Sequence, residues 1–113
     1  MTDNTDLTVN IAGIKMQNPV MVASGTFGFG NEYKNFYDIN KLGALVTKGL
    51  TLMPKAGNPP PRIHETPAGV LNSVGLENPG VEQFIAKEWP CLSKLKIPVI
   101  ANISGDTVED YYK

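Results

Sequence analysis

Three short apolar runs divide this chain and limit most strongly what it can fold into. They cover residues 20–23, 42–47 and 97–103. A continuous apolar run of this length suits a strand buried on both faces, as in a parallel sheet. Parallel strands need crossover connections. The patterns at about residues 32–40 and 81–89 predict a short helix in each of these places, between the runs. The order therefore predicts an α/β fold with a parallel sheet.

Smaller elements are expected around this sheet. Residues 7–11 and 14–16 alternate apolar and polar side chains about Ala12-Gly13, which predicts a β-hairpin before the first run. Residues 107–112 predict the start of a further helix. Residues 50–79 hold six prolines and several glycines, so we expect a long loop there, and such loops are usually functional.

The second helix has its own expected details. Asn78 is the expected N-cap and Pro79 the expected first helical residue. Phe84 and Trp89 are expected in the core. Cys91 follows Pro90 near the end of this helix, and we expect it to pack as a small apolar side chain rather than act as a nucleophile.

Composition excludes several classes of function. The net charge of −1 over 113 residues gives no electrostatic footprint for nucleic acid or an anionic membrane. No stretch approaches the roughly 20 apolar residues that span a bilayer, and the polar, acidic start is not a secretory signal, so a cytoplasmic protein is expected. A single cysteine excludes an internal disulfide, and the lone His64 has no neighbour at metal-ligand spacing.

Each apolar run ends in glycine or polar residues, at the edge where parallel α/β folds bind ligands. The three run ends are Ser24-Gly25, Lys48-Gly49 and Asn102. A lysine at the end of a buried strand can bind an anionic ring or a carboxylate, because a partly dry site strengthens the pairing. The alternative is that the strands simply end at polar residues and that Lys48 extends into solvent.

Several motifs, in order along the chain, carry a resemblance to a known family. They occupy residues 18–20, 23–33, 47–51, 57–66, 69–80 and 101–105. Together they resemble class 1B dihydroorotate dehydrogenases over nearly the whole chain from Leu7 onward. The run from Gly69 to Gly80 is the most specific piece.

The resemblance implies an FMN-containing (β/α)₈ TIM barrel that oxidises dihydroorotate to orotate in pyrimidine (UMP) biosynthesis. Residues 1–113 would be the N-terminal part of this single barrel domain, an incomplete barrel preceded by the hairpin. The implied flavin contacts are Ser24, Lys48, Gly49 and Asn102. The implied substrate contacts are Lys48, Asn72, Ser73, Val74, Gly75 and Leu76.

The resemblance also implies what these residues lack. In class 1 enzymes a cysteine on a later loop removes a proton from C5 of dihydroorotate, and that loop is expected beyond Lys113. No catalytic base is therefore assigned within the chain, and Cys91 lies outside the motif. Because the FMN phosphate site also lies late in such barrels, residues 1–113 alone are expected to be inactive.

Class 1B further implies a partner, an electron-transfer subunit that carries FAD and a [2Fe-2S] cluster and passes electrons to NAD⁺ within a heterotetramer. Class 1A relatives use fumarate instead, and the loop at residues 27–30 favours class 1B. Two alternatives stay open. One is a related flavin barrel of the dihydropyrimidine dehydrogenase type, and the other is an inactive, truncated fragment that folds poorly.

Overall fold

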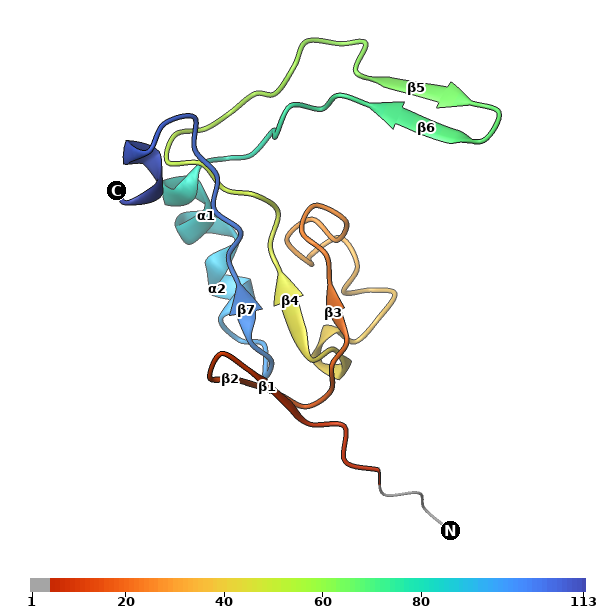
Figure 1. Ribbon diagram of the computed structural model, residues 1–113, viewed down its shortest axis with the longest axis vertical. Helices are drawn as coiled ribbons and strands as arrows, with labels where there is room; N and C mark the ends of the chain where they lie inside the picture. The colour runs from red at the N-terminus through yellow and green to blue at the C-terminus, as the bar shows by residue number, and fades with distance from the viewer. Residues whose placement is uncertain (1–4) are drawn as a thin grey trace.

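A three-stranded parallel sheet forms the centre of the fold (Figure 1). The computed structural model describes residues 5–113. The strands lie in the order β3 (Met21–Val22), β4 (Ala44–Val46) and β7 (Val99–Ile100). Leu45 of β4 pairs with Val22 on one side and Val99 on the other, and its side chain is fully buried. The predicted α/β arrangement with a parallel sheet is therefore confirmed.

The N-terminal hairpin is also confirmed. β1 (Val9–Ile11) and β2 (Ile14–Met16) pair antiparallel, with Val9 opposite Met16. Ala12 and Gly13 form the two-residue turn, and both have positive φ, 50° and 89°. Such a turn matches the twist of the two strands. The Asn10 side chain accepts a hydrogen bond from Gly13 N at 2.9 Å and closes the turn.

Two short helices, α1 (Val81–Lys87) and α2 (Trp89–Leu92), follow one another beside β7 (Figure 1). Phe84 and Leu92 are buried, as expected for Phe84. They join one apolar cluster with the sheet, whose buried members are Ile39, Leu42, Leu45, Leu50, Phe84, Leu92 and Ile97. This cluster is the core that supports the strand ends.

Two expectations on the second helix are wrong. Trp89 keeps 43% of its surface exposed, and Cys91 is exposed rather than packed. Pro90 lies in the first turn of α2, where its missing N–H costs nothing, but it cannot continue α1. The helix therefore stops at Lys87 and restarts, so the helical spacing from Phe84 does not carry Trp89 into the core.

The start of α1 also differs from the prediction. Gly80 is the N-cap, with a φ of 78° and no side-chain cap, and Val81 is the first helical residue. The oxygen of the Asn78 side chain instead accepts from Gly80 N at 2.9 Å and from Thr51 N at 3.1 Å. Asn78 is buried and holds a loop rather than capping a helix.

The helix expected at residues 32–40 is wrong. Successive turns lead there into a short 3₁₀ helix, η1 (Ile39–Lys41), capped by the Asp38 side chain, which accepts from Asn40 N. The rings of Phe27 and Tyr33 stack with centroids 4.2 Å apart and tie this segment back onto the preceding loop. The aromatic, Asn and Asp residues of this segment have modest helix propensity. The ring packing, rather than local propensity, therefore determines its backbone conformation.

Residues 50–79 are not the continuous loop that was expected. β5 (Ile63–Thr66) and β6 (Gly69–Asn72) form an antiparallel hairpin, with Ile63 opposite Asn72. Figure 1 shows this hairpin extending away from the sheet. All four residues of β6 are exposed. The hairpin was not predicted because neither strand alternates apolar and polar residues and prolines lie on either side of it; its turn is formed by Pro67-Ala68.

At the C-terminal end, the expected helix start is a short 3₁₀ helix, η2 (Glu109–Tyr111). The Asp110 carboxylate accepts hydrogen bonds from Thr107 N at 2.9 Å and Asp106 N at 3.0 Å. The backbone bond from Thr107 is the main reason that the pKa of Asp110 lies below its usual value of 3.8. Within residues 5–113, the structure contains no helix with the length and apolarity needed to span a bilayer.

Candidate functional site

The carboxyl ends of the three parallel strands bring the predicted flavin residues to one edge of the sheet. Ser24 follows β3, Lys48 and Gly49 follow β4, and Asn102 follows β7. Pairing continues past the regular strands, because Leu50 N donates to Asn102 O and Ser104 N donates to Leu50 O, each at 2.8 Å. Leu50 and Ile103 form a parallel bridge. Gly49 and Asn102 are therefore held on neighbouring, hydrogen-bonded backbones.

Side chains from the two outer strands meet across this edge. Asn102 Nδ2 donates to Ser24 Oγ at 2.6 Å. β3 and β7 are not neighbours, since β4 lies between them, so this hydrogen bond spans the end of β4. Ser24 is half-buried and Asn102 is exposed, which leaves polar atoms of this pair accessible from outside the sheet.

Gly49 provides space at the centre of the edge. The residue is buried, and a Cβ placed on it would lie 2.8 Å from Leu76 Cδ1 and 3.7 Å from Asn102 Nδ2. A side chain here would have to move the Leu76 side chain aside, so glycine permits the close approach of Leu76. Leu76 belongs to the predicted substrate segment. The structure thus brings Ser24, Gly49, Asn102 and Leu76 together.

Lys48 lies at the same strand end but its side chain borders a second space. Its backbone N–H donates to Gly28 O at 3.2 Å and joins β4 to the loop after β3. Lys48 is half-buried and lines a pocket of about 660 Å³ together with Glu32, Lys55 and Glu77. Glu77 pairs with Arg62, and Lys55 pairs with Asp106 at 2.8 Å. Lys48 is thus a cation at the edge of the sheet beside an open space.

The predicted substrate segment, residues 72–76, is held by a residue that the sequence did not single out. Asn58 Nδ2 donates to Ser73 O and to Ser73 Oγ, each at 2.9 Å, and Asn58 N donates to Val74 O at 2.9 Å. Gly75 has a φ of 78°, and a Cβ there would lie 2.7 Å from Asn58 N. The close crossing of residues 58 and 75 therefore requires glycine at residue 75.

Leu76 and Asn78 fix the other end of this segment. Leu76 has a φ of 57°, a strained conformation for a residue with a branched side chain, and such strain persists only where surrounding contacts enforce it. Asn78 supplies those contacts, because its Nδ2 donates to Leu76 O at 2.9 Å and to Thr51 Oγ1 at 3.0 Å. In the sequence Asn78-Pro79-Gly80 is typical of a turn, so nothing marked Asn78 as a buried anchor.

The structure does not bring every predicted site residue to one place. Asn72 and Ser73 are exposed and line a pocket with Arg62 and His64, whereas Lys48 lines the pocket with Glu32 and Glu77. The assignment of Asn72 and Ser73 to the same substrate as Lys48 stays a prediction. In the part of the chain that the structure describes, no group of three or more His, Cys, Asp or Glu side chains is arranged to hold a metal ion.

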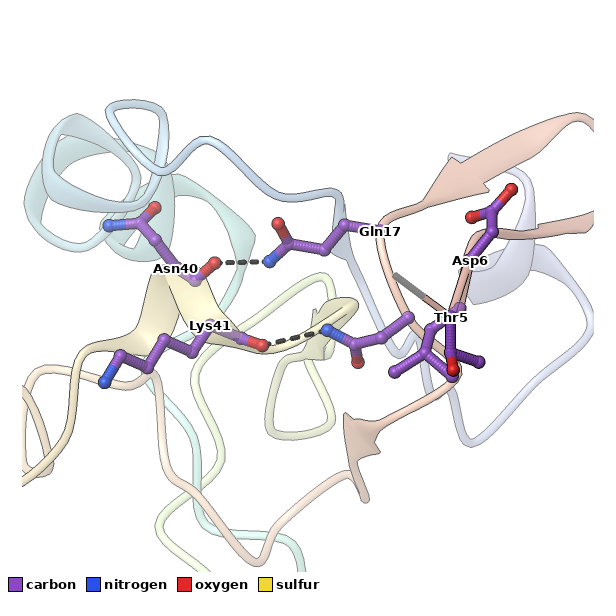
Figure 2. Close-up of a pocket in the computed structure, with 7 residues that line it drawn as sticks. Thr5, Asp6, Gln17, Asn40 and Lys41 are labelled. Atoms are coloured by element: carbon purple, nitrogen blue, oxygen red, sulfur yellow. Dashed lines mark hydrogen bonds between the residues drawn. The ribbon is translucent and has the colours of Figure 1, made fainter. Parts of the chain in front are cut away.

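A further pocket lies at the opposite edge of the sheet, before the strands begin (Figure 2). There Gln17 Nε2 donates to the carbonyls of Asn40 and Leu42, and Asn18 Nδ2 donates to Lys41 O at 2.9 Å. The side-chain amides of the segment before β3 thus donate their hydrogen bonds to backbone carbonyls of the segment before β4. We interpret these hydrogen bonds as structural contacts that connect the two segments, since ligands of α/β folds bind at the other edge.

Comparisons with known proteins agree with the resemblance seen in the sequence. The family model described as dihydroorotate dehydrogenase matches residues 6–113. The catalytic subunit of dihydroorotate dehydrogenase B (NAD⁺) from Thermoanaerobacter pseudethanolicus is 58% identical over 106 residues, which is 94% of this chain and 35% of that subunit. The corresponding subunit from Geotalea daltonii is 56% identical over the same shares. The chain thus spans about a third of the length of these relatives.

Solved structures give the same result for the fold. The crystal structure of DHODH from Eimeria tenella in complex with ferulenol superposes with a TM-score of 0.66 at 25% identity, over 97% of this chain and 33% of that one. The ligand-free form of the same enzyme gives a TM-score of 0.64 over 96% of this chain. The fold of this chain is therefore similar to part of an enzyme of known structure.

Proposed function

The chain belongs to the dihydroorotate dehydrogenase family, and on that premise we propose that the full protein oxidises dihydroorotate to orotate in pyrimidine (UMP) biosynthesis. Relatives 54–58% identical to the chain are named as catalytic subunits of this enzyme. Their greater length supports a second part of the proposal. Residues 1–113 form the N-terminal part of a single FMN-binding (β/α)₈ barrel domain, which takes about 250 residues.

One observation carries the proposal, the hydrogen bond from Asn102 to Ser24 over the buried Gly49. It joins a hydroxyl, a carboxamide and a glycine at the ligand-binding edge of a parallel sheet. A flat heterocycle that carries hydrogen-bonding nitrogen and oxygen atoms suits this combination, because the small residues permit close stacking and the polar groups fix its orientation.

These residues suit FMN, and we assign its contacts to Ser24, Lys48, Gly49 and Asn102. Ser24 and Asn102 would supply hydrogen-bonding groups to FMN, and the missing side chain of Gly49 would leave room beside it. When bound, FMN supplies the acceptor for the hydride that leaves dihydroorotate. Lys48 places a positive charge at this edge, where it stabilises the negative charge that develops during hydride transfer.

The substrate contacts are assigned to Lys48 and to the segment Asn72, Ser73, Val74, Gly75 and Leu76. Lys48 binds the substrate carboxylate, and the amides of the segment orient the pyrimidine ring. The contact of Leu76 with Gly49 supports this assignment, because it links the substrate segment to the flavin residues. We assign the proton base to a cysteine beyond Lys113, as in class 1 relatives.

The names of the relatives support a partner subunit. A catalytic subunit of an NAD⁺-linked enzyme implies a second subunit. We propose that this subunit carries FAD and a [2Fe-2S] cluster, passes electrons to NAD⁺ and forms a heterotetramer with the catalytic chain. A cytoplasmic location stays a prediction that cell fractionation can test.

The experiment uses the full-length protein, purified with any subunit that accompanies it. We expect a bound flavin whose oxidised absorbance is lost when dihydroorotate is added without oxygen, with orotate formed in equal amount. Absence of flavin, or a flavin that dihydroorotate does not reduce, would overturn the proposal.

Reduction by dihydrouracil instead would favour the dihydropyrimidine dehydrogenase type, and turnover with fumarate but not NAD⁺ would contradict the assigned acceptor. Residues 1–113 expressed alone are expected to show no turnover.

A further inference from the structure

Thr47 is the buried polar side chain closest in sequence to the candidate flavin residues. It follows β4 directly and has no exposed surface. Its backbone N–H donates to Ile100 O at 2.9 Å, so the sheet ladder fixes its position. A β-branched side chain on such a fixed backbone has few rotamers. The hydroxyl is therefore held in one place.

Both hydrogen-bonding capacities of this hydroxyl are used within the candidate site. Thr47 Oγ1 donates to Lys48 O at 3.0 Å and accepts from Asn102 N at 3.2 Å. The first bond holds the peptide that joins Lys48 to Gly49. The second bond holds the backbone of Asn102, whose amide side chain reaches Ser24. One hydroxyl thus connects three of the four residues that we assign to the flavin.

We propose that Thr47 is a positioning residue for the flavin site, which acts by fixing Lys48, Gly49 and Asn102 relative to one another. The proposal rests on the proposed function, because it takes FMN as the ligand of these residues. Thr47 itself has no exposed surface and would not contact a ligand directly. Without its hydroxyl, the Asn102 N–H and the Lys48 carbonyl lose a partly buried hydrogen-bond partner, and the backbones that carry the site relax.

Thr47→Val and Thr47→Ser separate the hydroxyl from the volume of the side chain. Valine keeps the branched shape and lacks the hydroxyl, whereas serine keeps the hydroxyl and lacks the methyl group. In the full-length protein, we expect Thr47→Val to raise the dissociation constant of FMN about tenfold, because both partly buried hydrogen bonds of the hydroxyl are lost. Thr47→Ser is expected to stay within about twofold of the wild type, because its hydroxyl can make the same bonds.

Hydrogen exchange gives a second readout that does not depend on flavin. The amide of Asn102 should exchange faster in Thr47→Val than in the wild type or in Thr47→Ser, measured by mass spectrometry on the peptide that contains it. Leu92→Ala is the control for general loss of stability, because Leu92 is a buried core residue on α2 and is not among the residues assigned to the site. This variant should unfold more easily and yet keep the FMN affinity of the wild type.

The outcomes distinguish the two proposals. A wild-type protein that binds no FMN would overturn the proposed function and, with it, the flavin role of Thr47. FMN binding that is unchanged in Thr47→Val, or equally weak in Thr47→Ser, would overturn the positioning role alone. An equal loss of affinity in Leu92→Ala would show that Thr47 acts only through overall stability.

Discussion

The sheet edge and the extended arm, residues 55–78, hold their predicted site residues by different means. At the edge, Thr47 and Gly49 are buried and the strand ladder continues beside them. In the arm, β6 is exposed along its whole length, and the contacts that fix the chain are polar, from Asn58, Arg62 and Asn78. The hydrogen-bonded backbones of the sheet therefore fix the predicted flavin residues, whereas a few hydrogen bonds at the base of the arm fix the predicted substrate segment.

The largest expected difference between the two regions concerns stability. Leu45→Ala empties a fully buried position in β4, and we expect a loss of about 2–5 kcal/mol in the free energy of unfolding. Leu71→Ala, the matched change in β6, removes a side chain that is 65% exposed, and a loss below about 0.5 kcal/mol is expected. Urea unfolding of the full-length protein measures both. Equal losses would mean that the arm is buried in the full protein and that the comparison does not hold.

Loss of the Lys48 charge at the strand end should lower the turnover rate rather than the stability of the fold. Lys48→Ala is expected to lower kcat about 10²–10³-fold, because a group that stabilises developing charge is lost. Lys55→Ala is the matched control, since Lys55 lines the same pocket but pairs with Asp106 on the surface. Rates of flavin reduction by dihydroorotate in the full-length protein test both variants. Near-normal reduction in Lys48→Ala would count against its assigned role.

Removing the buried anchor of the arm should loosen the substrate segment while sparing the sheet. Asn78→Ala leaves Thr51 N and Leu76 O without their partner, and a loss of about 1–3 kcal/mol is expected. Faster proteolysis within residues 55–78, together with a raised KM for dihydroorotate, would locate the effect. Asn58→Ala removes the exposed hydrogen bonds to Ser73. It should show the same pattern more weakly, because water replaces exposed partners.

The smallest expected effect depends on pH and lies outside both regions. The pKa of Asp110 is lowered in the folded protein, mainly by the hydrogen bond from the Thr107 backbone. A carboxyl group with a lowered folded pKa stabilises the fold above its unfolded pKa, and this contribution is lost as the pH falls through the folded pKa. Asp110→Ala should therefore be slightly less stable than the wild type near neutral pH. Its deficit should shrink below pH 3.8, and a deficit that is constant with pH would contradict this cause.

The sequence predicted those parts of the fold in which local pattern and packing agree. Alternation predicted the N-terminal hairpin, and continuous apolar runs predicted the parallel sheet. The helix predicted at residues 32–40 does not form, because the local helix propensity is modest and the stack of Phe27 on nearby Tyr33 ties the segment to the preceding loop. The β5–β6 hairpin was missed because nearby prolines suggested a loop throughout.

The site was partly predictable for a similar reason. The residues at the strand ends could be named, since parallel strands finish at one edge. The hydrogen bond between Asn102 and Ser24 could not be predicted from the sequence pattern, because it depends on the order of the strands. In the sheet, β4 lies between β3 and β7. The roles of Thr47, Asn58 and Asn78 depend on the direction of single hydrogen bonds, and no spacing in the sequence encodes that direction.

The bond between Ser24 and Asn102 also bears on how the chain folds. It joins residues 78 positions apart, and the β4–β7 pairing joins Leu45 to Val99. Bringing such distant residues together carries a large entropy cost of loop closure, whereas the β1–β2 hairpin closes across two residues. During synthesis, the predicted flavin site therefore cannot assemble until Asn102 has left the ribosome. The site is thus completed only after all three strands of the parallel sheet have been made.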